Sequence, residues 1–150
     1  MSEINSLITI SLEDQMQFVA KNNIGCRIPI EPPVFMGGSG KAPNPIDYLA
    51  VSLGGCTSIK IISDLSKKGF KVDSFKMKVD GTRSKTTPGM FEKLHLVVTL
   101  SGDLEEQKVA EIIQEIIMHT CPVAAMFRKL FEITWELHIL ENDSHANPMK

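Results

Sequence analysis

Two cysteines stand in settings that favour thiol chemistry. Cys56 directly follows a glycine pair in N-P-I-D-Y-L-A-V-S-L-G-G-C-T (44–57), and Cys121 directly precedes a proline in H-T-C-P-V (119–123). A thiolate is a nucleophile and a metal ligand, so the chemistry of a cysteine depends on the surroundings that shift its pKa. The elements that carry Cys56 and Cys121 therefore decide what these residues can do.

Cys56 lies in the middle of a predicted long helix that starts after Asn44 and ends at Gly69. Asn44 is a good N-cap, and glycine at the far end supplies the left-handed residue that terminates a helix. Between Asp47 and Lys60 there is no charged side chain, so we expect most of the helix surface to be covered by protein or by a partner subunit. The sequence predicts a long, buried central helix.

The glycine pair before Cys56 lowers the stability of such a helix. Each glycine destabilises a helix by roughly 1 kcal/mol relative to alanine, so Gly54 and Gly55 are expected where a second helix, another backbone or a substrate comes close. The simpler interpretation of Cys56 is a small buried apolar residue.

Cys121 is predicted to lie at a helix start. A second helix is expected from Asp103, as its N-cap, to about Thr120, and Pro122 favours the start of a new short helix. The amide groups and positive dipole end at a helix N-terminus favour a thiolate, so we expect the pKa of Cys121 to be lowered from its reference of about 8.5.

Alternating apolar residues predict six strands around these helices. An early three-stranded antiparallel meander would place Cys26 on its apolar face, which favours a core role for this thiol, and Arg27 on the opposite face. A later antiparallel pair and a last strand complete the set, which spans about residues 8–12, 16–20, 24–30, 75–79, 94–100 and 131–139.

The element order is three strands, a long helix, two strands, two helices and a strand. It predicts an α+β fold with a largely antiparallel sheet, in one domain over 1–150 with frayed tails at 1–4 and 141–150. The uncharged central helix is most simply explained by helices of two subunits that pack together, so we expect a homodimer.

Composition excludes several classes of function. A net charge of −2, with three arginines among 16 basic residues, indicates no nucleic-acid partner. No phosphate-binding loop follows a strand, and no apolar run approaches the roughly 20 residues that span a membrane. The first residues lack a basic signal-peptide region, so we expect a cytoplasmic protein.

With both cysteine motifs placed, the chain resembles the OsmC/Ohr family of thiol-dependent peroxidases. The resemblance rests on residues 44–57, on 119–123 and on the last strand, I-T-W-E-L-H-I (133–139). It implies an intertwined homodimer with active sites at the interface, where Cys56 attacks an organic hydroperoxide and becomes a sulfenic acid. Cys121 then forms a disulfide with it, and an external thiol or a lipoylated protein reduces that disulfide; no metal or organic cofactor takes part.

The sequence departs from the family pattern at one position. Many peroxidatic members carry a glutamate directly after N-P, where it holds an arginine that activates the thiolate, whereas this chain has Ile46. Asp47, one place later, and Arg27 are the candidates for an acidic and a basic partner of Cys56. Their alternative interpretations are a helix N-terminal charge and a solvated strand charge.

One other function remains open, and two more are disfavoured. Without the glutamate, the chain is alternatively a non-catalytic member that binds a small apolar ligand or a partner at the dimer pocket. A metal site from Cys121, His119 and a further cysteine or histidine is disfavoured, because H-T-C lacks the ligand spacing of common zinc sites. A serine hydrolase is disfavoured by the lack of a G-x-S-x-G motif.

Overall fold

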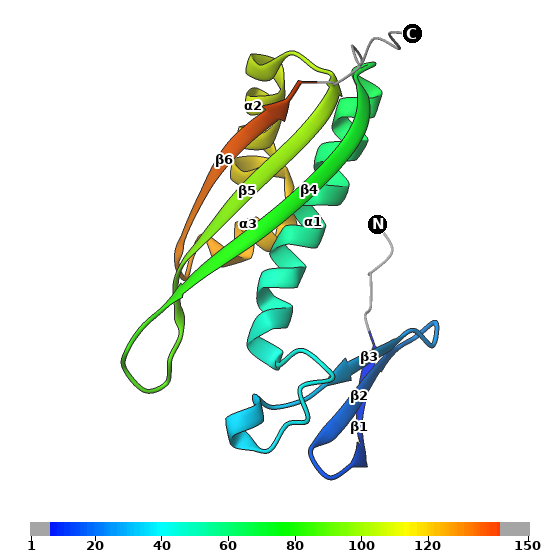
Figure 1. Ribbon diagram of the computed structural model, residues 1–150, viewed down its shortest axis with the longest axis vertical. Coiled ribbons are helices and arrows are strands. Elements are labelled where there is room, and N and C mark those ends of the chain that lie inside the picture. Colours follow the sequence, from blue (N-terminus) through cyan, green and yellow to red (C-terminus); the bar gives the residue numbers. More distant parts are fainter. Residues whose placement is uncertain (1–6, 142–150) are drawn as a thin grey trace, which may run out of the picture. The chain divides into compact units, whose positions relative to one another are not determined.

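The computed structural model describes residues 7–141 (Figure 1). These residues form two compact units that divide between Leu49 and Ala50. The predicted tail at 1–4 and all but the first residue of the predicted tail at 141–150 lie outside the described residues. The elements follow the predicted order, so the mixed α+β class is confirmed. The single domain over 1–150 stays a prediction.

The first unit is an antiparallel meander followed by a loop. Strands β1 (Ile8–Asp14), β2 (Gln17–Asn22) and β3 (Arg27–Ile30) pair in that order, and a short 3-10 helix, η1 (Val34–Met36), follows. The buried carboxylate of Glu31 accepts hydrogen bonds from the backbone N–H of Ser39 at 2.7 Å and from its hydroxyl at 2.8 Å, which closes the loop on itself.

The predicted core position of Cys26 is wrong for this unit. Its strand begins one residue later, at Arg27, and Cys26 is exposed in the turn, where its N–H donates to the Asn22 side chain at 2.9 Å. The predicted strand over residues 24–30 was therefore three residues too long at its start, because the apolar alternation continues through the turn.

Helix α1 (Pro45–Lys67) has the predicted ends. The Asn44 Oδ1 accepts the N–H groups of Ile46 at 2.9 Å and Asp47 at 3.2 Å, as an N-cap does. At the far end Gly69 has a φ of +82°, and the Phe70 N–H returns to the Leu65 carbonyl at 3.1 Å, which is the Schellman pattern.

The second unit has one three-stranded sheet. Strands β4 (Lys71–Arg83) and β5 (Phe91–Asp103) are antiparallel as predicted, and β6 (Glu132–Leu140) pairs with β5 in parallel. The chain from β5 to β6 passes through α2 (Glu106–Glu115), a π-helical turn η2 (Ile116–Thr120) and α3 (Pro122–Phe127), and a parallel pair needs such a crossover. Asp103 ends β5, so its predicted role as the N-cap of α2 is wrong; Glu105 holds that position.

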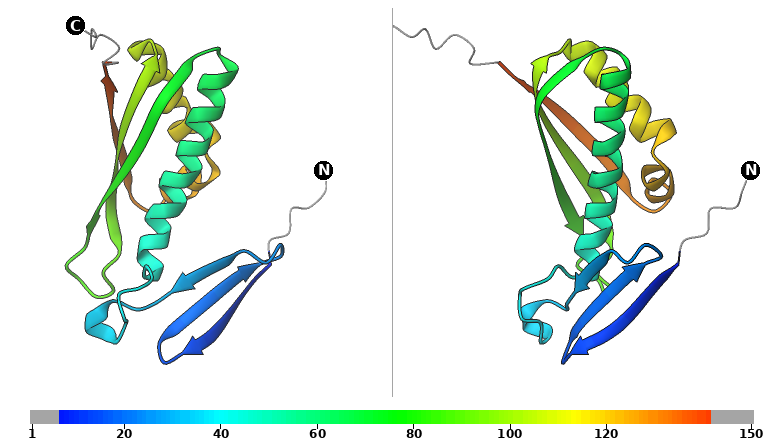
Figure 2. Two further views of the ribbon diagram at one scale, coloured as in Figure 1. Left: turned by 45° about the vertical axis from the view of Figure 1, so that its right-hand side comes forward. Right: turned by 90° about the vertical axis from the view of Figure 1, so that its right-hand side faces the viewer.

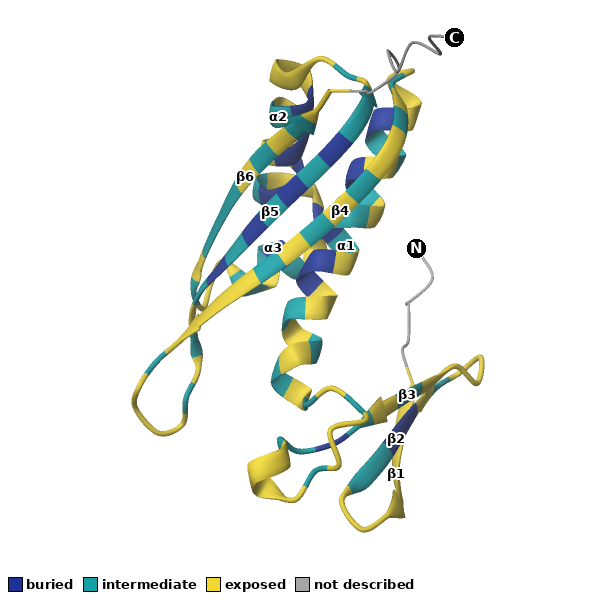
Figure 3. Ribbon diagram, viewed as in Figure 1, coloured by how far each residue is buried: buried dark blue, intermediate teal, exposed yellow. Residues whose placement is uncertain are grey.

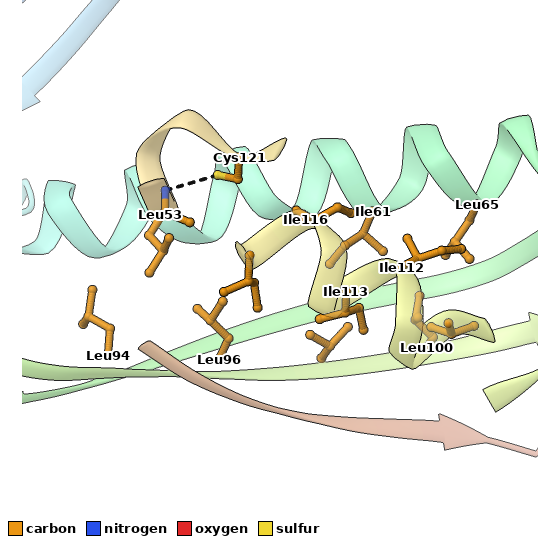
Figure 4. Close-up of a cluster of buried hydrophobic side chains, with 14 residues drawn as sticks. Leu53, Ile61, Leu65, Leu94, Leu96, Leu100, Ile112, Ile113, Ile116 and Cys121 are labelled. Carbon is orange, nitrogen blue, oxygen red and sulfur yellow. Dashed lines mark hydrogen bonds between the residues drawn. The ribbon is translucent and has the colours of Figure 1, made fainter. Parts of the chain in front are cut away.

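The core of this unit lies between the sheet and the two longer helices. Figure 2 shows α1 and α2 on the same face of the sheet, and Figure 4 shows their side chains meeting those of β5. Fully buried members of the cluster come from all three elements, among them Leu53, Ile61, Leu96, Leu100 and Ile113. Cys121 stands at the edge of the same cluster (Figure 4).

Within this chain, α1 buries one face only. Leu53, Gly54, Thr57, Ile61 and Leu65 are buried. An apolar stripe on the same helix, formed by Val51, Gly55, Ile59 and Ile62, is exposed, and Figure 3 shows buried and exposed positions on the helix. The prediction of a buried helix therefore holds for one side of α1 in a single chain. No helix in the described part of the chain is long and apolar enough to cross a membrane.

Candidate active site

The two cysteines of the sequence motifs meet in the second unit. The thiol of Cys121 donates a hydrogen bond to Cys56 Sγ with the sulfur atoms 3.1 Å apart, and both thiols are free. A disulfide has its sulfurs about 2.05 Å apart, so a closure of roughly 1 Å would join this pair. The residues are 65 positions apart in sequence, and the fold of α1 against the crossover brings them together.

Local sequence fixes the position of Cys56 on α1. It lies between the buried face of the helix, marked by Leu53 and Thr57, and the exposed stripe that contains Gly55. Gly54 is needed on the buried side, because a Cβ built there would lie 2.8 Å from Val79 Cγ2 of strand β4. Gly54 therefore packs against side chains of β4, while the predicted approach of a second helix, another backbone or a substrate to the glycine pair stays a prediction. Within residues 7–141, nothing lies within 4 Å of a Cβ built on Gly55.

Cys121 has the predicted place at the start of a helix. It is the N-cap of α3, Pro122 is the first helical residue, and Cys121 Sγ accepts the Ala124 N–H at 3.4 Å. Figure 4 shows this bond as a dashed line. The thiol is only 1% exposed.

The predicted direction of the Cys121 pKa shift is wrong. Burial in the apolar cluster raises the pKa of Cys121, and the hydrogen bond to Cys56 adds to this, while the Ala124 N–H acts in the opposite direction without prevailing. Burial disfavours the charged thiolate more than one long N–H···S bond favours it. Cys121 therefore holds its proton, and its S–H group is the donor of the pair.

The other two predicted site residues have partners within the first unit. Arg27 on β3 forms an ion pair with Glu13 on β1. Asp47 accepts hydrogen bonds from the Asn44 side-chain amide at 2.7 Å and from its backbone N–H at 3.2 Å, so it completes the N-cap of α1. Their proposed roles beside Cys56 stay predictions.

A contact of Arg128 near Cys121 has no signal in the sequence. Arg128, just after α3, donates from Nη2 to the Met118 carbonyl at 2.6 Å. Nothing in the sequence signals this bond, because it depends on how the chain turns back between α2 and α3.

A metal centre finds no support among the described residues. Across residues 7–141, no group of three or more histidine, cysteine, aspartate or glutamate side chains is arranged to hold a metal ion. His119, the histidine of the H-T-C motif, lines an open groove together with Met118 and Trp135.

A buried thiol that donates to a second thiol on a long helix, within this α+β fold, defines a candidate two-cysteine redox site. Residues 38–136 match the model of the OsmC-like protein family. The chain also shares 30% identity over 106 residues with protein YhfA of Escherichia coli, which covers 69% of this chain and 79% of YhfA. The protein belongs to the OsmC-like family.

Solved structures agree with this fold. A hypothetical protein from Aquifex aeolicus superposes with a TM-score of 0.81 at 22% identity, covering 93% of this chain and 98% of that one. The organic hydroperoxide resistance protein OhrB of Bacillus subtilis superposes with a TM-score of 0.65 at 18% identity, covering 89% and 98%. At these identities the likeness concerns the fold.

Proposed function

We propose that this protein is a two-cysteine thiol peroxidase that reduces organic hydroperoxides. The observation that carries the proposal is the direct contact of Cys121 Sγ with Cys56 Sγ at 3.1 Å. Membership of the OsmC-like family and a fold shared with the hydroperoxide resistance protein OhrB support it.

The reaction assigns different roles to the two thiols. The Cys56 thiolate attacks one oxygen of the hydroperoxide, the O–O bond breaks, and the products are a Cys56 sulfenic acid and an alcohol that takes up a proton. Cys121 then attacks Cys56 Sγ, the S–O bond breaks, and water leaves with the Cys121 proton as the disulfide forms. A thiol or dithiol reductant, for example a lipoyl group, returns two electrons to the disulfide.

The surroundings of each thiol fit these roles. Cys56 is half-buried, so a substrate has access to it, whereas Cys121 is buried and protonated, which protects it from direct oxidation. Both thiols lie against the apolar cluster, which favours an alkyl or aryl hydroperoxide over hydrogen peroxide.

Turnover assays with single variants test this proposal. With dithiothreitol as reductant, wild-type protein should consume cumene hydroperoxide and Cys56→Ser should not, because the attacking sulfur is gone. Cys121→Ser should accumulate a sulfenic acid that dimedone traps. Cys26→Ser is the matched control, since Cys26 is exposed on the other unit and should leave turnover unchanged. Full activity in Cys56→Ser would contradict the assignment.

We also propose that the protein is a homodimer formed through α1. The exposed stripe on this helix consists of Val51, Gly55, Ile59 and Ile62, with Val51 58% and Ile59 75% exposed. Their spacing of four, four and three residues places them on one side of the helix, and the glycine allows a second helix to approach closely. Such a contact would cover the side of α1 next to Cys56.

Sedimentation equilibrium tests the dimer. Wild-type protein should sediment at about twice 16.6 kDa, and Ile59→Glu should shift the mass towards the monomer because it places a charge in the stripe. Met90→Glu is the control, because Met90 is an exposed apolar residue in the β4–β5 loop and not part of the α1 stripe. A wild-type monomer at high concentration would refute the dimer.

A second candidate function follows from Ile46. If the loss of the family's glutamate removed the peroxidase activity, the fold would serve to bind a small apolar ligand at the dimer interface. In that case the thiols of the wild-type protein would resist cumene hydroperoxide, and an apolar fluorescent probe would bind to the dimer but not to Ile59→Glu.

A further inference from the structure

The chain makes an unusual turn immediately before Cys121. Residues Ile116–Thr120 are π-helical, and the Cys121 N–H donates to the Ile116 carbonyl, five residues earlier, at 2.8 Å. Single π-helical turns are rare, and they occur frequently at functional sites. The turn ends with Cys121 in an extended conformation, which directs the chain into α3.

Arg128 joins the segments on the two sides of Cys121. Its Nη2 donates to the carbonyl of Met118 at 2.6 Å, and Nη1 lies 3.8 Å from the sulfur of the same residue. Its backbone N–H donates to the carbonyl of Ala124 at 2.9 Å. Met118 lies three residues before Cys121 and Ala124 three residues after it.

The hydrogen bonds of Arg128 involve residues that themselves hold the Cys121 thiol in place. Ala124 supplies the N–H that Cys121 Sγ accepts, and Met118 lies within the π-helical turn that closes on the Cys121 N–H. A carbonyl at a helix end has no helical partner of its own, and an arginine guanidinium is well suited to bind it because its donors form a planar fork. Arg128 therefore closes a loop of hydrogen bonds around Cys121.

We propose that Arg128 is a positioning residue for the step in which Cys121 forms the disulfide with Cys56; this inference rests on the proposed function. The condensation needs Cys121 Sγ to close the gap from 3.1 Å to a bonded distance of about 2.05 Å along one direction. A misplacement of about 1 Å in a reacting group can slow a reaction by about a hundred-fold. Arg128 does not contact either sulfur, so it acts through the turn.

The test separates sulfenic acid formation from disulfide formation. In rapid-quench experiments with cumene hydroperoxide, Arg128→Met should form the dimedone-reactive sulfenic acid at the wild-type rate and close the disulfide about ten- to a hundred-fold more slowly. More sulfinic acid should accumulate, because the sulfenic acid lives longer. Arg128→Lys, which keeps one charged donor, should recover part of the closure rate.

A matched control is available at Arg83. Its Nε also donates to a carbonyl, that of Gly89 at 2.8 Å, but in the β4–β5 loop, so Arg83→Met should leave both steps unchanged. Wild-type closure rates in Arg128→Met, at a temperature where the variant is folded, would overturn the inference while leaving the peroxidase intact.

A second readout does not need peroxide. In buffers of reduced and oxidised glutathione, the equilibrium between the two thiols and their disulfide reports how well the pair is placed. Arg128→Met should shift this equilibrium about ten-fold or more towards the thiols, and an unchanged equilibrium would overturn the inference. If wild-type protein ignored peroxide but the shift were observed, the proposed function would fail and the positioning role of Arg128 would stand.

Discussion

Replacing Gly54 by alanine should strain the packing of α1 on strand β4. A methyl group at this position would lie 2.8 Å from Val79 Cγ2 and 3.7 Å from Met77 Cγ. Carbon atoms in contact normally stand about 3.5–4.0 Å apart, so the new methyl overlaps Val79 by about 0.7 Å or more. Strand β4, the Val79 side chain or the helix has to move.

Two opposing effects set the size of the change. Overpacking a well-filled core costs typically about 1–3 kcal/mol, and alanine in place of glycine returns about 1 kcal/mol of helix stability. The expected net destabilisation of Gly54→Ala is therefore about 0–2 kcal/mol. In a Val79→Ala background the overlapping methyl is gone, so the same change should stabilise the protein by about 1 kcal/mol.

A double-mutant cycle measures this coupling directly. Denaturant unfolding of the wild type, Gly54→Ala, Val79→Ala and the double variant, at several protein concentrations, should give an interaction energy of about 1–3 kcal/mol. For a chain of 150 residues, each kcal/mol of destabilisation lowers the melting temperature by about 2–4 °C. Simple additivity of the two changes would show that position 54 does not pack against Val79.

Three further predictions concern the ends of elements and the ionisable groups. Asn44→Ala should destabilise the protein by about 1 kcal/mol in denaturant unfolding, because the first N–H groups of α1 lose their acceptor. The pKa of Cys121 is raised in the folded protein, so the thiol loses its proton at a lower pH in the unfolded chain than in the folded one. The free energy of unfolding should therefore fall as pH rises above about 8.5. Cys121→Ser should remove this part of the loss, measured as the melting temperature against pH. The Lys60 hydrogen bond lowers the pKa of Asp64, so the carboxylate should titrate below 3.8 by NMR, and Lys60→Met should raise that pKa; an unchanged titration would contradict the ion pair.

Local signals in the sequence were enough to place both ends of α1 and the start of α3. An N-cap asparagine, a terminal glycine and a proline at the first helical position act within a few residues of themselves, so they predict Asn44, Gly69 and Pro122 in their observed roles. The place of Cys121 at a helix start followed from the same proline.

Features that depend on distant parts of the chain were not predictable in this way. Apolar and polar residues alternate in the same way in parallel and antiparallel strands, so the sequence did not determine that β6 runs parallel to β5. The pKa of Cys121 depends on burial between α1 and the crossover, which outweighs the local helix effect. The contact of Cys56 with Cys121 was implied by family resemblance, and the bond from Arg128 to Met118 had no local signal at all.

We propose above that Cys56 and Cys121 form a working redox pair. The most direct measurement is a count of free thiols before and after one equivalent of cumene hydroperoxide, with peptide mapping of the oxidised protein. Two of the three thiols should disappear and a Cys56–Cys121 disulfide should be found, with Cys26 still free. Three unreacted thiols, or oxidation of Cys26 in preference to Cys56, would contradict it.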